Sequence, residues 1–80
     1  MNKDFAQHVA RVAFRSSADL NDLIPLLKEH CDQEEYAKYL KAIASASAEI
    51  STAILARIFS SYPELEQDFE EMIRRYGRLV

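Results

Sequence analysis

Residues 33–61, QEEYAKYLKAIASASAEISTAILARIFSS, contain neither proline nor glycine. Apolar side chains and two serines recur there at intervals of three and four: Tyr36, Leu40, Ile43, Ser47, Ile50, Ile54, Ile58 and Ser61. This interval is typical of one face of an α-helix. Asp32, three residues before Glu35, has the spacing of a capping box, which satisfies the first backbone N–H groups of a helix. The stretch therefore predicts one helix, whose apolar face Leu55 and Phe59 widen toward its end.

Two further helices are predicted before position 32, at about 3–15 and 20–31. The first has an N-cap at Asn2 and a narrow apolar stripe: Phe5, Val9, Val12 and Ala13. Residues that favour caps over helix interiors then interrupt the pattern: Ser16, Ser17 and Asp19. Pro25 favours a second helix capped at Asp22, because a proline loses no hydrogen bond in a first helical turn. One kinked helix from Ser16 onward is the alternative.

Residues 63–76 predict the last helix. Tyr62 and Pro63 end the long helix, and a proline suits the first turn of the next one. Its apolar face comprises Leu65, Phe69, Met72, Ile73 and Tyr76. Carboxylates lie in its first turns and arginines near its end, which complements the helix dipole and allows Glu70–Arg74 and Glu71–Arg75 ion pairs. Gly77 suits the left-handed residue that follows a helix.

Composition and length indicate one small all-α domain over residues 1–80. The chain has one glycine, two prolines and 49% hydrophobic residues, which favours helices over strands that need frequent turns. We expect a compact bundle of four helices. A chain of 80 residues buries only about 60% of its unfolded surface, so a second subunit would help to stabilise it. Charged residues interrupt the N-terminal stretch, no uninterrupted apolar run approaches 18 residues, and Cys31 is the only cysteine, so a cytoplasmic protein without a membrane span is expected.

The run of small residues at 42–48 is the candidate for a close helix crossing. A helix over 33–61 is about 43 Å long, whereas a compact domain of this size is about 30 Å across. Another helix, in this chain or in a second copy, would then cover the overhang; a solvent-facing run of good helix formers is the alternative. The candidate contact residues are Ala42, Ala44, Ala46, Ser47 and Ala48, with Tyr39 and Phe14 outside the main stripes of their helices.

A polar stripe with basic character, His8, Arg11 and Arg15, lies beside the apolar stripe of the first helix. It could contact phosphates, so a regulator associated with nucleic acid is the alternative function. The net charge of −3 gives no electrostatic support for such binding. An ion-paired contact with the acidic last helix is the simpler use of this stripe.

No arrangement of residues in the sequence predicts catalysis, a metal or a cofactor. The neighbouring His30 and Cys31 point about 100° apart on a helix, and no second pair completes a zinc site. One glycine excludes a glycine-rich phosphate loop. We therefore expect no enzyme, but a small adaptor or regulatory protein that binds protein and acts as a homodimer.

Overall fold

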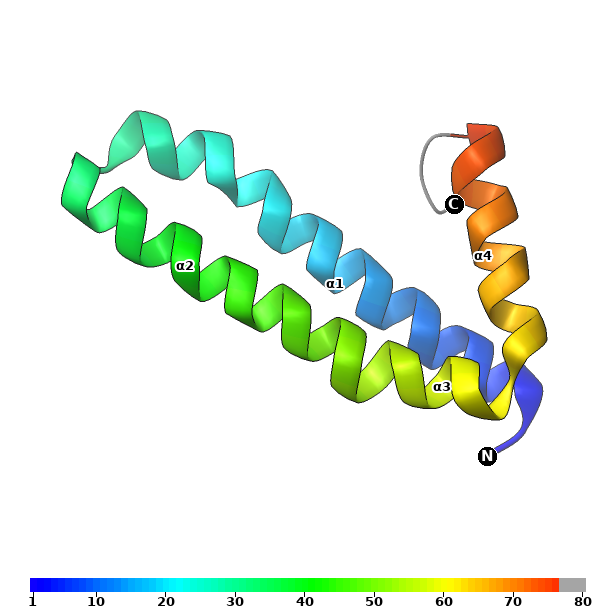
Figure 1. Cartoon of the computed structure of the whole chain (residues 1–80). Coiled ribbons are helices and arrows are strands. Elements are labelled where there is room, and N and C mark those ends of the chain that lie inside the picture. Colours follow the sequence, from blue (N-terminus) through cyan, green and yellow to red (C-terminus); the bar gives the residue numbers. More distant parts are fainter. Residues whose placement is uncertain (77–80) are drawn as a thin grey trace.

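The residues that the computed structural model describes, 1–76, fold into three helices and no strand, which confirms the all-α prediction. The first helix is α1 (Lys3–His30). The second is continuous over residues 33–61 and comprises α2 (Gln33–Glu49), the π-helical turn η1 (Ile50–Leu55) and α3 (Ala56–Ser61). The third is α4 (Pro63–Tyr76). Figure 1 shows α1 and the 33–61 helix as an antiparallel hairpin, with α4 beginning at the open end of the hairpin.

The prediction of four helices is wrong, because the segments 3–15 and 20–31 belong to one helix. Ser16 does not cap a new helix; its hydroxyl donates to the carbonyl of Val12 at 2.8 Å, a bond compatible with a continuing helix. A row of residues that are buried or half-buried runs through the expected break: Ala6, Ala10, Ala13, Ser17, Leu20, Ile24 and Leu27. Their spacing of three and four places them on one face. Packing along this face therefore overrides the local preference of residues 16–19 for a cap.

Pro25 lies in the interior of α1, and its prediction in the first turn of a separate helix is wrong. A proline there leaves the carbonyl of Asn21, four residues earlier, without its helical donor, at a cost of about 3 kcal/mol. Both residues are exposed, so water can bond this carbonyl. The half-buried Ile24 and Leu27 continue the inner row across the proline, and their packing offsets part of the cost.

Three of the predicted helix starts are confirmed. The Asn2 side chain accepts from the Phe5 N–H at 2.8 Å, and the capping box at Asp32 and Glu35 is complete. Pro63 is the first residue of α4. Of the two predicted ion pairs in α4, Glu71–Arg75 is present, with Arg75 Nη2 and Glu71 Oε1 2.7 Å apart. The prediction for Gly77 lies outside the described residues.

The turn η1 shifts by one residue the positions at which the 33–61 helix faces α1 and the core, and we call this side its inner face. Its inner row comprises Ile43, Ser47, Ile50, Leu55 and Ile58. The step from Ile50 to Leu55 is five residues, which in a regular α-helix would place Leu55 about 140° away from the row. In the wider π-turn the Ala56 N–H donates to the carbonyl of Ser51, five residues earlier, and Leu55 returns to the inside with 8% exposure. The single regular helix expected over 33–61 is therefore continuous but contains one extra residue.

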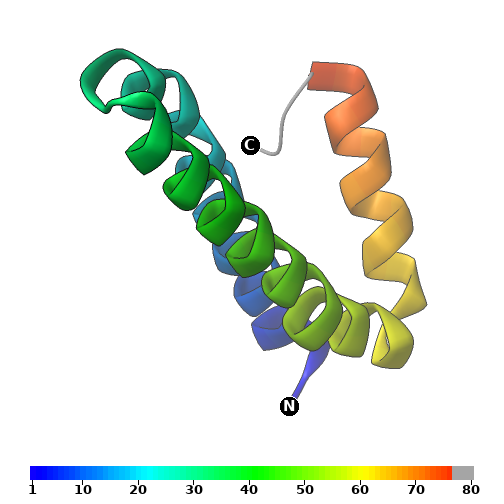
Figure 2. The same cartoon turned by 60° about the vertical axis from the view of Figure 1, so that its left-hand side comes forward.

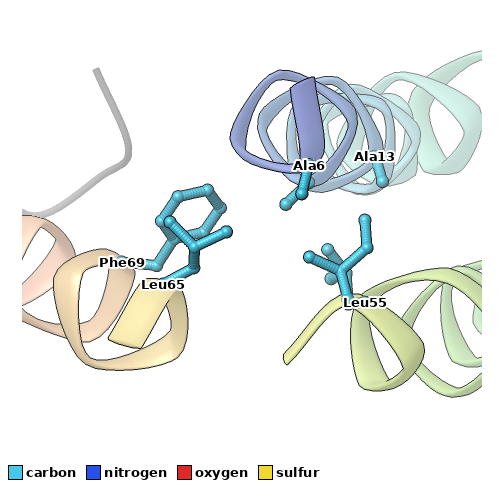
Figure 3. Close-up of a cluster of buried hydrophobic side chains, with 7 residues drawn as sticks. Ala6, Ala13, Leu55, Leu65 and Phe69 are labelled. Atoms are coloured by element: carbon cyan, nitrogen blue, oxygen red, sulfur yellow. The ribbon is translucent and has the colours of Figure 1, made fainter. Parts of the chain in front are cut away.

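The core lies where all three helices meet, at the open end of the hairpin. Its buried members are Ala6, Ala10, Ala13, Leu55, Ile58, Leu65 and Phe69. Figure 3 shows Ala6 and Ala13 of α1 facing the larger side chains of η1 and α4. Phe69 also contacts Phe59 edge-on, with ring centroids 5.7 Å apart. The close helix approach that small residues permit thus occurs at the alanines of α1.

The molecule is extended, so the prediction of a compact bundle is wrong. Its radius of gyration is 14.7 Å and its principal extents are 45 × 25 × 15 Å, whereas a compact chain of 80 residues has a radius of gyration of about 12 Å. Because α1 has 28 residues, it runs beside almost the whole 33–61 helix and covers the expected overhang. Figure 2 shows α4 diverging from the hairpin beyond their contact.

Candidate protein-interaction surface

An open apolar groove lies between α1 and η1. Its lining comprises His8, Val9, Val12, Ala13, Ser16, Ile50 and Ile54. None of these residues belongs to α4, which packs on another side of α1, where Gln7 lines a separate hollow with residues of α4. The groove is thus a hydrophobic surface that the described part of the chain leaves uncovered. We call it the α1–η1 groove.

The side of α1 that lines this groove includes most of the predicted apolar stripe. Phe5 and Val12 belong to the predicted stripe, yet their side chains are 55% and 47% exposed. Val9 is half-buried, and the Phe5 ring lies beside the His8 ring, with centroids 6.4 Å apart. The buried face is instead the alanine row beginning at Ala6. The predicted stripe is therefore divided: Phe5 and Val12 face outward, where they can contact another molecule, whereas Val9 and Ala13 pack in or against the core.

The π-turn contributes the other wall of the groove. Ile54 and Leu55 are neighbours, and the turn directs Leu55 into the core and leaves Ile54 39% exposed in the groove. A regular helix with Ile54 on its inner row, as the sequence predicts, would instead bury Ile54. Unusual helical turns of this kind are frequent at functional sites, and this one supplies an apolar side chain to the surface.

The run at 42–48 lies on the outside of the 33–61 helix. Its four alanines are exposed: Ala42, Ala44, Ala46 and Ala48. No helix within residues 1–76 covers them, so a solvent-facing run and a crossing with another molecule both remain compatible with their position. Ser47 is half-buried on the inner row, and its hydroxyl oxygen is buried without a hydrogen-bond partner. Ala46 lies one turn before Ile50, which places it on the groove side of the helix.

The two aromatic candidates lie in different environments. Tyr39 is 53% exposed on α2. Phe14 is half-buried and packs against the core cluster, so it contributes to folding within the chain. The structure therefore does not bring all the predicted contact residues onto one surface.

The basic stripe is only partly accessible. His8 and Arg15 are exposed, whereas Arg11 is half-buried and its Nε atom is buried without a partner. The ion pair that the structure has between α1 and α4 is made by Lys3, which is not part of the stripe and whose Nζ lies 3.6 Å from Glu64 Oε1. His8 also lines the α1–η1 groove. The stripe therefore does not form one continuous positive surface.

The described residues contain no group of three or more His, Cys, Asp or Glu side chains that could hold a metal ion. No polar or charged residue within 1–76 is classed as buried.

Within residues 1–76, one helix has the length and apolar composition of a membrane span. It is the helix Gln33–Ser61, whose most apolar window of 18 residues has a mean hydropathy of 1.4 and is 17% buried. Core helices of soluble proteins and signal sequences meet the same criterion, so this observation is weak.

Comparisons of the chain with protein-family models, curated proteins and solved structures give no match. The candidate surface therefore rests on the physical features of the chain. The sequence did signal the alanine row of α1 by its spacing of four and three at Ala6, Ala10 and Ala13. The larger apolar residues of the predicted stripe lie beside that row, and two of them, Phe5 and Val12, are exposed.

Proposed function

We propose that the protein functions by binding protein, as a small adaptor or regulatory homodimer. The observation that supports this proposal most directly is the solvent-accessible surface area of the chain. A compact monomer of this mass exposes about 4,900 Å², whereas this chain exposes 5960 Å². The excess of about 1,000 Å² is similar to the roughly 800 Å² that each partner loses in a standard protein interface.

The arrangement of the helices supports the same proposal. A stable domain generally has two packed layers of secondary structure, but the closed end of the hairpin contains only α1 and α2 (Figure 1). Large apolar side chains are exposed along the hairpin: Phe5, Val12, Leu23, Leu26, Tyr39, Leu40 and Ile54. Large apolar side chains are exposed in this way at protein-interaction sites. A second hairpin would supply the missing layer.

Nucleic-acid association through the basic stripe receives less support. Asp4 lies one helical turn before His8, and Asp19 one turn after Arg15. These carboxylates reduce the positive potential that phosphate binding requires.

Sedimentation at several protein concentrations tests the proposal. We expect the wild type to form a dimer at micromolar concentration. The variant Val12→Lys, which places a charge in the α1–η1 groove, should weaken the dimer by at least tenfold, because burying an unpaired charge is unfavourable. Ala18→Lys is the matched control, since Ala18 is exposed on α1 and does not line the groove. A wild type that stays monomeric at high micromolar concentration would rule out the homodimer.

A second pair of variants tests the run at 42–48. Ala46→Leu enlarges the side of the helix that precedes Ile50, whereas Ala44→Leu enlarges a different side. If a second copy crosses at Ala46, overpacking costs about 1–3 kcal/mol and the first variant shifts toward monomer while the second behaves like the wild type. If neither variant alters assembly or the melting temperature, the run is a solvent-facing piece of helix.

A further inference from the structure

We propose that the homodimer forms through α1. In each subunit, the side of α1 that lines the α1–η1 groove packs against the same side of α1 in the second copy, and the two helices run in opposite directions. This inference rests on the proposed function and adds the surface and the orientation. Three observations carry it: an apolar stripe that extends along α1, the separation of positive and negative charge along the same helix, and the area left open.

The exposed apolar residues of α1 form one long stripe. Phe5, Val12 and Leu23 are exposed and are separated by seven and eleven residues. These intervals correspond to about two and three turns, so the three side chains lie on the same side of the helix. Val9 and Ser16 of the groove lie between them, and Leu26 extends the stripe by one turn near its border. The stripe spans about 32 Å of helix, far more than a single ligand needs.

The charges of α1 are divided between its two halves. The first half carries Lys3, Arg11 and Arg15 against one acid, Asp4, and the second half carries Asp19, Asp22 and Glu29 against one base, Lys28. Lys3 is paired with Glu64 of α4, so in an antiparallel pair Arg11 and Arg15 of each copy face the acidic half of the other. A parallel pair would place like charges together. Charge complementarity of this kind determines the register and orientation of an interface.

The midpoint of the stripe is near Ser16, which lines the groove and is exposed. A two-fold axis at this point places Val9 opposite the partner's Leu23 and Phe5 within one residue of the partner's Leu26. It also places the small Ser16 side chain opposite the partner's Ser16, where the two helices approach each other most closely. A two-fold interface uses the same surface on both subunits, and this stripe pairs large apolar side chains at its ends and small ones at its middle.

The available area fits this arrangement. The whole chain exposes about 1,000 Å² more than a compact monomer of its mass, which is of the same order as the roughly 800 Å² that each partner loses in a standard interface. Because no residue of α4 lines the groove, the second copy reaches the stripe without displacing α4. The two hairpins together would form a two-layered, four-helix core.

Disulfide trapping tests the orientation. Cys31 is first changed to Ser, and Ser16→Cys then places one thiol near the proposed axis. A disulfide needs two Cα atoms within about 7 Å, so under mild oxidation most of the Ser16→Cys chain should run as a covalent dimer on a non-reducing gel. Ala18→Cys, an exposed site on another side of α1, should remain monomeric. The wild-type Cys31 should also fail to cross-link, because it lies at the hairpin's closed end and an antiparallel dimer separates these two ends.

A second measurement tests the same orientation without a substitution at position 16. Phe5→Cys and Leu26→Cys chains, each with Cys31→Ser, are mixed and oxidised. The antiparallel pairing predicts the mixed disulfide in preference to either homodimer. If the reduced chains are dimeric by sedimentation but Cys31 cross-links and these sites do not, the α1 arrangement is wrong while the proposed function stands.

A monomeric wild type overturns both proposals, and two further experiments then identify the occupant of the stripe. Sedimentation with vesicles of phosphatidylcholine and phosphatidylglycerol that is lost in Val12→Lys would assign the stripe to a membrane surface. Absence of vesicle binding, together with Val12-dependent binding of an amphipathic helical peptide, would assign it to a helix of another protein. Either result excludes the second copy.

Discussion

The turn η1 contains one residue more than a regular helix needs, so removing one residue there should preserve the fold. Deleting Ala53 shortens the step from Ile50 to Leu55 from five positions to four. A regular α-helix then keeps both side chains on the inner row. Ala53 is half-buried, but it contributes only a methyl group. We expect the variant to retain the helical signal and at least the melting temperature of the wild type.

Insertion of one alanine after Ala53 is the matched opposite change. The step from Ile50 to Leu55 then becomes six, and the existing wide turn can no longer return Leu55 and Ile58 to the inside, since each extra residue rotates them by about 100°. Both are buried, at 8% and 6% exposure. Burying one such side chain contributes about 1.5–3 kcal/mol, so the insertion should cost about 3–6 kcal/mol.

This loss is large for the chain. A domain of 80 residues is stabilised by about 4–12 kcal/mol in total, and a loss of 3 kcal/mol lowers the melting temperature by roughly 12–24 °C. Circular dichroism during thermal and urea unfolding measures both variants. A deletion variant that loses most of its helical signal, or an insertion variant that melts like the wild type, would refute the assignment of η1 as the element that resets the inner face.

Two further outcomes are expected from single substitutions. Pro25→Ala restores a donor for the carbonyl of Asn21, so the fold should persist and be stabilised by up to about 3 kcal/mol; loss of most of the helical signal in circular dichroism would show a structural role for the proline. Leu65→Ala should cost about 2–5 kcal/mol in urea unfolding, because Leu65 is fully buried, whereas Leu40→Ala should cost less, since Leu40 is 37% exposed; equal losses would contradict the placement of α4 on the core.

The candidate surface could be predicted only in part. The sequence grouped Phe5, Val9, Val12 and Ala13 as one apolar stripe, but the structure divides this stripe, since Phe5 and Val12 are exposed whereas Ala13 is buried. Whether a stripe faces inward depends on which neighbour it meets. In this chain the alanine row beginning at Ala6 faces the larger side chains of η1 and α4 (Figure 3), because small residues allow the helices to approach closely and leave room for those side chains.

Local physics alone determined that the chain is helical and where its helices start. The side chains of Asn2 and Asp32 accept from backbone N–H groups within three residues, and Pro63 restricts its own backbone. Such signals act between near neighbours and need no tertiary partner. The apolar spacing of residues 33–61 likewise specified a long helix without reference to the remainder of the chain.

Only the tertiary structure decided that α1 is continuous, that its alanine row faces inward, and that the 33–61 helix contains a π-turn. Each of these features has a local cost, such as the proline inside α1 or the wider hydrogen-bonded ring at Ser51 and Ala56. That cost is offset by contacts between residues far apart in sequence, such as Ala6 and Leu65 in the shared core. A single sequence shows the local cost but not the distant contact. A helix break was therefore predicted at residues 16–19, where α1 continues. The faces of the helices were likewise judged by the size of their apolar side chains and not by the neighbours that they meet.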